Sequence, residues 1–176
     1  MTGVILFGKM PSHGDFVTRG LEIHKRDELD RWLSGEMAEA SSALGEDFEP
    51  QFDSAPPWRF AWKDERWTAG AMATSVDAAG RRFPLLVGRR GIEAGMVTFV
   101  ADSCEEAIYG AFANAWSVDE LTAALPLAPA IEDDRGAARE AWWTLGGEEF
   151  PPQSLAGRMP AGLMCAMLGC SERTAV

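Results

Sequence analysis

Side chains that can take part in catalysis or recognition gather first in residues 8–16, directly after the apolar run 4–7. A short β-rich run that leads into Gly, Pro, Ser and Asp predicts a strand that ends in an exposed turn. In α/β proteins, turns of this kind often carry the groups that recognise a ligand. This turn offers an amine, a hydroxyl, an imidazole and a carboxylate, from Lys9, Ser12, His13 and Asp15. It is therefore the first candidate site.

A second polar cluster spans residues 74–85 and lies between two predicted strands. It offers a hydroxyl, a carboxylate and two guanidinium groups, from Ser75, Asp77, Arg81 and Arg82. Two such turns would share one end of a sheet if their strands are neighbours. In that case Asp15 would pair with one of the two arginines, or Asp77 with Lys9. The sequence alone leaves these pairings open.

The residue types of a hydrolytic triad are present, since Ser12, His13 and Asp15 supply a nucleophile, a base and a carboxylate. Neighbours along one turn point in divergent directions, which disfavours a triad made of these three. A set of His13 with Ser75 and Asp77 is geometrically possible. The chain lacks a Gly-x-Ser-x-Gly elbow, however. We predict that the protein is not an enzyme, with a small hydrolase as the alternative.

An anion-binding sensor is a further alternative, in which cations from the turns 8–16 and 75–82 hold the ligand; these cations are Lys9, Arg81 and Arg82. The phosphate-loop pattern G-x-x-x-x-G-K-[ST] is absent. In the structural interpretation, Gly and Pro set the path of the first turn, and Ser12 and Asp15 bond to nearby backbone amides. Phe16 would then fill the core.

Composition narrows the class of protein further. At 176 residues the chain suits a single domain over 1–176. Its formal net charge of −11 argues against nucleic acid and anionic membranes, both of which need a basic surface, and is compatible with a basic partner. No apolar run approaches the roughly 20 residues of a membrane span, and no signal peptide is visible. We therefore expect a cytoplasmic protein without membrane insertion.

The three cysteines predict no metal or cofactor site. Cys104, Cys165 and Cys170 form no CxxC pair, and both histidines lie far away in sequence. We interpret them as free thiols in a reducing compartment and as small core residues. No cofactor is predicted.

Hydrophobic periodicity and turn signals divide the chain into alternating strands and helices. The predicted strands are 3–8, a hairpin of 58–62 and 67–74, 83–88, 96–100 and 140–145. The predicted helices are 26–44, one that starts at a capping box of Ser103 and Glu106, 117–124 and 162–168. Loops are expected at 46–57, 89–95 and 126–136. This order predicts an α/β fold with a mixed sheet, including an antiparallel hairpin, covered by helices on both faces.

Tryptophan is abundant in two of these strands. Trp58, Trp62 and Trp67 lie on the predicted hairpin and are expected in the core. Trp142 and Trp143 are adjacent, and adjacent residues on a strand face opposite sides. One of the two is a candidate partner anchor unless a helix covers it.

Several motifs in a fixed order resemble one known family. They are GKMPSHGDFVTRGL at 8–21, Trp32-Leu33, APPWRF at 55–60, and SVD at 75–77 followed by GRRFPL at 80–85. Together they resemble the TagF (ImpM-type) family of type VI secretion system accessory proteins. The similarity covers residues 3–90 well and the remainder only loosely.

This resemblance implies both a fold and a function. The expected fold is a single-domain, three-layer α-β-α sandwich. The expected function is non-enzymatic: a post-translational negative regulator that binds a forkhead-associated scaffold protein of the secretion system in the cytoplasm. The eight polar residues of the two turns are then part of an interaction surface rather than of an active site.

Overall fold

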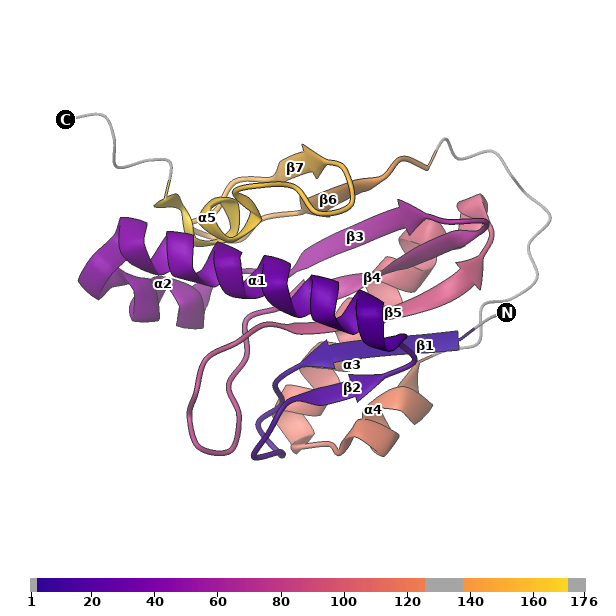
Figure 1. Ribbon diagram of the computed structural model, residues 1–176, viewed down its shortest axis with the longest axis horizontal. Coiled ribbons are helices and arrows are strands. Elements are labelled where there is room, and N and C mark those ends of the chain that lie inside the picture. The colour runs from indigo at the N-terminus through magenta and orange to yellow at the C-terminus, as the bar shows by residue number, and fades with distance from the viewer. Residues whose placement is uncertain (1–2, 126–137, 171–176) are drawn as a thin grey trace.

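The computed structural model describes residues 3–125 and 138–170. Within them, seven strands form one sheet in the order β2-β1-β5-β4-β3-β6-β7 (Figure 1). Their bounds are β1 (Gly3–Gly8), β2 (Val17–Arg19), β3 (Trp58–Lys63), β4 (Trp67–Ala73), β5 (Leu85–Ile92), β6 (Ala141–Thr144) and β7 (Gln153–Ala156). The α/β class and the hairpin of β3 and β4 are confirmed. The prediction of a mixed sheet is wrong, because each of these strands runs antiparallel to its neighbours.

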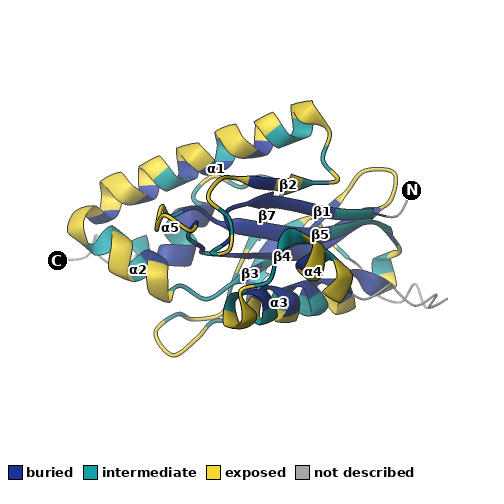
Figure 2. Cartoon of the chain, turned by 90° about the horizontal axis from the view of Figure 1, so that it is seen from below, coloured by how far each residue is buried: buried dark blue, intermediate teal, exposed yellow. Residues whose placement is uncertain are grey.

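Helices lie on both faces of this sheet, with α1 on one side and α3 and α4 on the other (Figure 2). The described helices are α1 (Ile23–Leu44), α2 (Phe48–Ser54), α3 (Val97–Asn114), α4 (Val118–Ala124) and α5 (Leu163–Leu168). Short 3-10 turns at Gly45–Asp47 and Ala94–Met96 lead into α2 and α3. The buried apolar residues form two clusters, one with α1, α2 and α5 and the other with α3 and α4.

The central strands supply both clusters because successive side chains of a strand point to opposite faces. Leu86 of β5 packs on the α1 side, and its neighbours Leu85 and Val87 pack on the α3 side. In β1, Ile5 and Leu6 divide in the same way. Because strands β1 and β5 are buried on both faces, their sequences contain continuous apolar runs, and these runs allowed both strands to be predicted from the sequence.

A buried carboxylate joins α1 to the C-terminal helix. Glu36 is only 6% exposed. Its two oxygens accept hydrogen bonds from the backbone amides of Gly162 and Met164, both at 3.0 Å. These amides lie at the start of α5, where helix N–H groups have no partner within the helix. Glu36 therefore fixes where α5 begins.

Residues 46–57 are not a loop as predicted, since α2 occupies most of this stretch. Phe48 and Phe52 lie one helical turn apart with their ring centroids at 5.7 Å, and Phe52 is buried. Burial of this pair against the α1-side cluster stabilises a helix in an otherwise acidic segment. Pro50 falls in the first turn, where no backbone hydrogen bond is lost.

The predicted strand 96–100 and the capping box at Ser103 are also wrong. The chain is helical from Val97, and Ser103 lies inside α3 with its hydroxyl donating to the carbonyl of Phe99 at 2.8 Å. Val97, Val100 and Cys104 recur at helical spacing and are all buried, so burial overrides the local β preference. The strand predicted at 83–88 extends as β5 to residue 92, into the expected loop 89–95.

Other predicted elements are confirmed, including the capping box of Ser117 and Glu120 at α4, strand β6 and helix α5. The short edge strands β2 and β7 were missed. The loop predicted at 126–136 lies outside the described residues.

The predicted core tryptophans are confirmed: Trp58, Trp62 and Trp67 are buried. Trp142 is fully buried, and Trp143 is partly buried against the α3-side cluster, so neither projects freely as an anchor.

Candidate functional site

The first turn (residues 8–16) and the second turn (residues 74–85) meet at one end of the sheet (Figure 1). Antiparallel pairing places the end of β1 beside the start of β5. Contact continues beyond the strands, because the amide of Ala78 donates to the carbonyl of His13 at 2.7 Å. The candidate residues of the two turns therefore belong to one surface.

Gly8 allows the two turns to approach this closely. Its φ is +132°, which side-chain-bearing residues rarely adopt. A Cβ at this position would lie 1.9 Å from the carbonyl oxygen of Pro84. The next amide, of Lys9, donates to that same carbonyl at 3.3 Å.

The carboxylate of Asp77 is the centre of the site. One oxygen accepts from the backbone amides of Ala79 at 3.0 Å and Arg81 at 2.9 Å. The other accepts from Nε of Arg81 at 2.8 Å and pairs with Nζ of Lys9 at 3.1 Å. Asp77 is 2% exposed, so this network is nearly closed to solvent. Its four donors occupy both oxygens, which leaves no room for a histidine to be oriented by this carboxylate.

This environment stabilises the charged form of Asp77. Burial of the carboxyl raises its pKa, but hydrogen bonds from the Arg81 backbone and from the side chains of Lys9 and Arg81 more than offset that effect. The pKa consequently falls from the ordinary 3.8 to about 2. Asp77 therefore remains an anion at neutral pH and acts as a fixed acceptor.

Lys9 connects this network to an aromatic cluster. It is 7% exposed, and Nζ lies 5.2 Å from the ring centroid of Phe16. Phe16 packs against Phe7 and Phe83 with ring centroids at 5.9 and 4.8 Å. Phe16 is 48% exposed, so it covers the aromatic cluster instead of filling the core as expected.

Ser12 and His13 are adjacent and bonded to each other, but in a way that does not activate the serine. Oγ of Ser12 lies 2.9 Å from Nδ1 of His13 and donates to the carbonyl of Trp116 at 2.6 Å. A carbonyl can only accept, so the hydroxyl proton goes to Trp116 and Nδ1 of His13 must be the donor. That nitrogen therefore cannot remove a proton from Ser12, as a triad base would.

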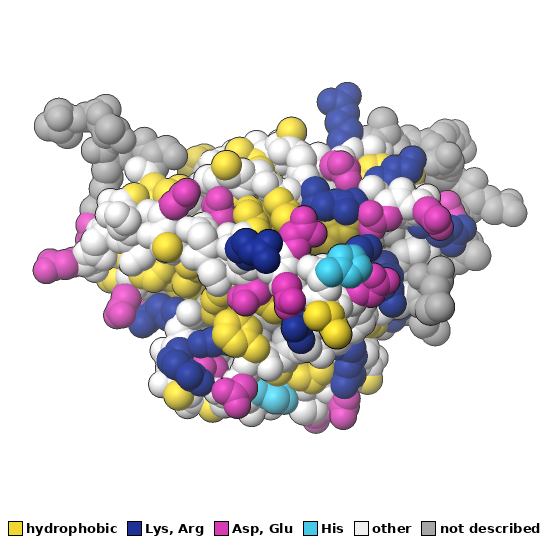
Figure 3. Space-filling view, viewed as in Figure 1, with side chains coloured by type: hydrophobic (Ala, Val, Ile, Leu, Met, Phe, Trp, Pro, Cys, Tyr) yellow, Lys and Arg dark blue, Asp and Glu magenta, His cyan; other side chains and the backbone are white. Residues whose placement is uncertain are grey.

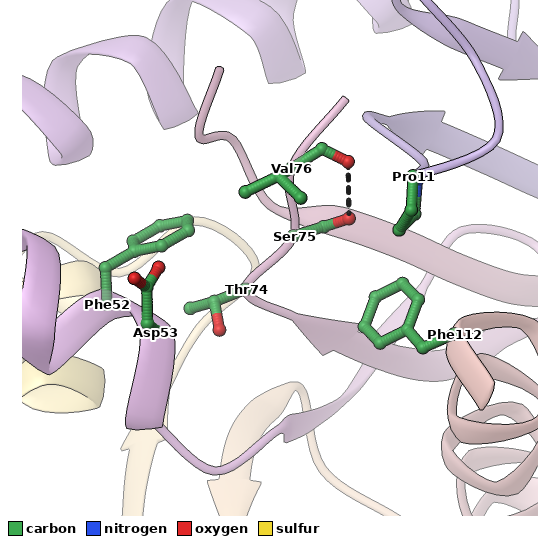
Figure 4. A pocket seen from close by; sticks show the side chains of 7 residues that line it. All are labelled: Pro11, Phe52, Asp53, Thr74, Ser75, Val76 and Phe112. Carbon is green, nitrogen blue, oxygen red and sulfur yellow. Dashed lines mark hydrogen bonds between the residues drawn. The ribbon is translucent and has the colours of Figure 1, made fainter. Parts of the chain in front are cut away.

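Ser75 lies beside a small pocket of about 260 Å³ between α2, α3 and the two turns (Figure 4). The residue is 6% exposed, and its hydroxyl donates only weakly, at 3.4 Å, to the carbonyl of Val76. Phe52, Asp53 and Phe112 also line the pocket. No functional signal in the sequence pointed to these three residues, and two of them, Phe52 and Asp53, lie in α2, which was predicted as a loop.

Arg82 and Arg81 are both paired with carboxylates. The guanidinium of Arg82 makes two hydrogen bonds of 2.8 Å to Asp53 and lies 3.2 Å from Glu49. These bonds to Arg82 lower the pKa of Asp53. With Lys9 and Arg81 on Asp77, the three cations proposed for an anion sensor are satisfied within the protein. The arrangement therefore disfavours an anion site here.

Asp15 is the most exposed member of the surface. Its side chain is 99% accessible and lies 3.8 Å from Arg81. Arg81 donates to the carbonyl of Gly14 at 2.6 Å, which holds this part of the turn. The expectation that Ser12 and Asp15 bond to nearby backbone amides is wrong. Ser12 donates to the distant carbonyl of Trp116, and near Asp15 the backbone is held by Arg81 instead.

Within the described part of the chain, no group of three His, Cys, Asp or Glu side chains is placed to hold a metal. Cys104 is buried as predicted, and burial raises the pKa of its thiol to about 12. Cys165 and Cys170 are only partly buried. A helix long and apolar enough to cross a membrane is likewise not found among residues 3–125 and 138–170.

Fold and site thus define an α/β protein whose two turns are joined at one end of an antiparallel sheet by the buried carboxylate of Asp77. A family model described as the TagF N-terminal domain, type VI secretion system-associated, matches residues 5–127. The chain belongs to this TagF family.

A solved structure supports the fold. The chain is similar to PA0076 from Pseudomonas aeruginosa PAO1, with a TM-score of 0.74 and 21% sequence identity. The match covers 95% of this chain and 94% of that one. A search of curated proteins found no match.

Proposed function

We propose that this protein is a non-enzymatic accessory protein of the type VI secretion system. It acts in the cytoplasm as a post-translational negative regulator by binding a forkhead-associated scaffold protein. The observation that carries the proposal is the match of residues 5–127 to the TagF N-terminal domain, a type VI secretion-associated family.

The bonding within the two turns supports a binding role over a catalytic one. Lys9 and Arg81 are held by Asp77, and the Ser12 hydroxyl donates its proton to a carbonyl. Groups that are satisfied by one another fix the shape of a surface. They do not supply a free base or nucleophile.

Charge supports the choice of partner. Forkhead-associated domains recognise phosphorylated or acidic motifs through clusters of Arg. The chain has a net charge of −11, and Asp15 projects from the first turn with its carboxylate almost fully accessible. An acidic surface of this kind suits such a partner.

The proposal is tested by calorimetric titration of the purified scaffold with the purified chain, together with a secretion assay. We expect saturable one-to-one binding. Overproduction of the chain is expected to reduce secretion while the cellular level of the secreted substrate stays constant.

A matched variant separates binding from catalysis. Ser75→Ala removes the buried hydroxyl of the alternative triad and is expected to leave both readouts unchanged. Absence of scaffold binding, or loss of regulation in a folded Ser75→Ala protein that still binds the scaffold, contradicts the proposal.

A further inference from the structure

A second concave site lies beneath the N-terminal part of α1, away from the two turns. This groove has a volume of about 580 Å³, within the range of small-molecule sites. Its apolar wall comes from the sheet, α1 and the segment before α5, through Ile5, Leu29, Trp62 and Met159. Charged side chains of both signs surround it, and Figure 3 shows them intermingled on the face crossed by α1.

Three neighbouring strands present a row of different side chains to this groove. Trp62 pairs in register with Thr68, and Thr68 with Arg90. The next residue in the row is Gly3 of β1, opposite Arg90. A Cβ at Gly3 would lie 3.2 Å from Nε of Arg90, so glycine leaves space beside the guanidinium. The groove thus offers an indole, a hydroxyl and a guanidinium side by side.

The two polar members of this row have no partner among the described residues. Nε of Arg90 is buried and makes no hydrogen bond, and Arg90 forms no ion pair. Thr68 is 4% exposed, and its hydroxyl likewise makes no hydrogen bond there. Buried polar groups are nearly always satisfied, so the buried and unpaired Nε of Arg90 favours an external acceptor. The hydroxyl of Thr68 lies in register beside Arg90 and can donate to the same acceptor.

The other cations of the groove differ from Arg90, because each has a carboxylate partner. Lys25 and Arg158 lie 3.6 and 3.0 Å from Asp64, and Arg66 pairs with Glu93. Arg90 is therefore the groove cation whose donors are available to a ligand.

We propose that this groove binds a carboxylate that carries an apolar group. Arg90 and Thr68 donate to the carboxylate, since a guanidinium matches its two oxygens, and the apolar group packs on Trp62 and Leu29. The carboxylate belongs either to a free organic acid or to the C-terminus of a peptide. This site is independent of the scaffold-binding function proposed above.

The charge of the groove favours a monoanion over a phosphate. Four acidic residues line it, namely Glu22, Glu28, Asp64 and Glu65, against four cations, Lys25, Arg66, Arg90 and Arg158. Glu28 and Glu65 have no cationic partner among the described residues. Arg90 is the one lining cation without a carboxylate partner among the described residues, so a monoanion balances its charge. A dianion would leave one negative charge unbalanced beside Glu28 and Glu65.

The test is a titration with phenylacetate, followed by calorimetry and by NMR of the Trp62 indole N–H and Arg90 Nε–H. An N-acetylated Gly-Phe dipeptide with a free carboxylate tests the peptide source. We expect one or both to saturate the site. The uncharged amides, phenylacetamide and the amidated dipeptide, are expected to bind at least about tenfold more weakly.

Two variants test whether the side chains of Arg90 and Thr68 bind the carboxylate. Arg90→Gln keeps much of the side chain and is expected to weaken binding about 10- to 100-fold without lowering the melting temperature. Thr68→Val is expected to weaken it severalfold. The matched control Arg66→Gln removes a cation of the same groove that is already paired, and is expected to change affinity less than about threefold.

Three results would overturn the assignment. One is that neither carboxylate saturates the wild-type protein. Another is that Arg90→Gln binds as well as the wild type or no worse than Arg66→Gln. The third is that phenyl phosphate binds more tightly than phenylacetate.

Discussion

At the scale of single residues, Asp77 determines how the two turns are joined, because its carboxylate accepts hydrogen bonds from both. Lys9 belongs to the first turn and Arg81 to the second, and each contacts the same oxygen of Asp77. Asp15 carries the same charge but is almost fully exposed. Two carboxylates that look equivalent in the sequence therefore have different roles, one structural and one available to a partner.

Asp77→Asn is expected to destabilise the protein, because Lys9 would keep its charge while it remains buried without its counter-ion. Thermal unfolding should show a melting temperature several degrees below that of the wild type. The control Asp15→Asn should have the same melting temperature as the wild type. Equal melting temperatures for all three proteins would contradict the role given to Asp77.

The lowered pKa of Asp77 predicts acid sensitivity. The folded protein holds this carboxyl at a pKa of about 2, against 3.8 ordinarily, so the folded state binds the proton less readily than the unfolded state. The stabilisation is complete above about pH 4 and is lost as the pH falls towards 2. Urea unfolding across this range should give a shallower pH dependence for Asp77→Asn. The same pH dependence of the unfolding free energy in the wild type and in Asp77→Asn would contradict this prediction.

Gly8→Ala tests the close approach of the turns. The added Cβ would clash with the Pro84 carbonyl at a φ that alanine disfavours, so we expect a loss of about 2–4 kcal/mol in unfolding free energy. Gly14→Ala is the control, because no atom lies within 4 Å of a Cβ there. Urea titrations of both variants provide the comparison, and similar losses would argue against a special role for Gly8.

At the scale of elements, the helices of the α1 side depend on contacts between distant segments. The N-terminus of α5 is held by Glu36 from the middle of α1, and α2 is held by burial of Phe52. Neither segment is long enough to be a stable helix by itself. Their positions therefore depend on α1 and on the sheet.

Glu36→Ala is expected to loosen α5 selectively. Two buried amides would lose their acceptor, which costs about 1–3 kcal/mol. Hydrogen exchange should then accelerate in α5 more than in β4 or β5. Glu39→Ala removes an exposed carboxylate from the same helix and should leave exchange unchanged. Uniform acceleration across the sheet would show that Glu36 has no specific role at α5.

At the scale of the whole molecule, the sequence predicts elements with their own periodicity and misses those made by distant contacts. The aromatic alternation of 58–62 was sufficient to predict β3, and the capping box at Ser117 was sufficient to predict the start of α4. Helix α2 was not predictable, because Phe52 is buried by segments far away in the chain. The pairing of Asp53 with Arg82, 29 residues apart, was hidden for the same reason. The Lys9 and Asp77 pair was foreseen only as one of several possibilities.

The central claim is that the surface formed by the two turns binds a partner and performs no chemistry. It is tested most directly by the affinity of the purified forkhead-associated scaffold for a His13→Ala/Asp15→Ala variant, measured by calorimetry. Glu106→Ala, on the exposed side of α3, is the control. We expect the double variant to keep the wild-type melting temperature and to bind about tenfold more weakly, with Glu106→Ala unchanged. Wild-type affinity in the folded double variant would place the interface elsewhere and contradict the claim.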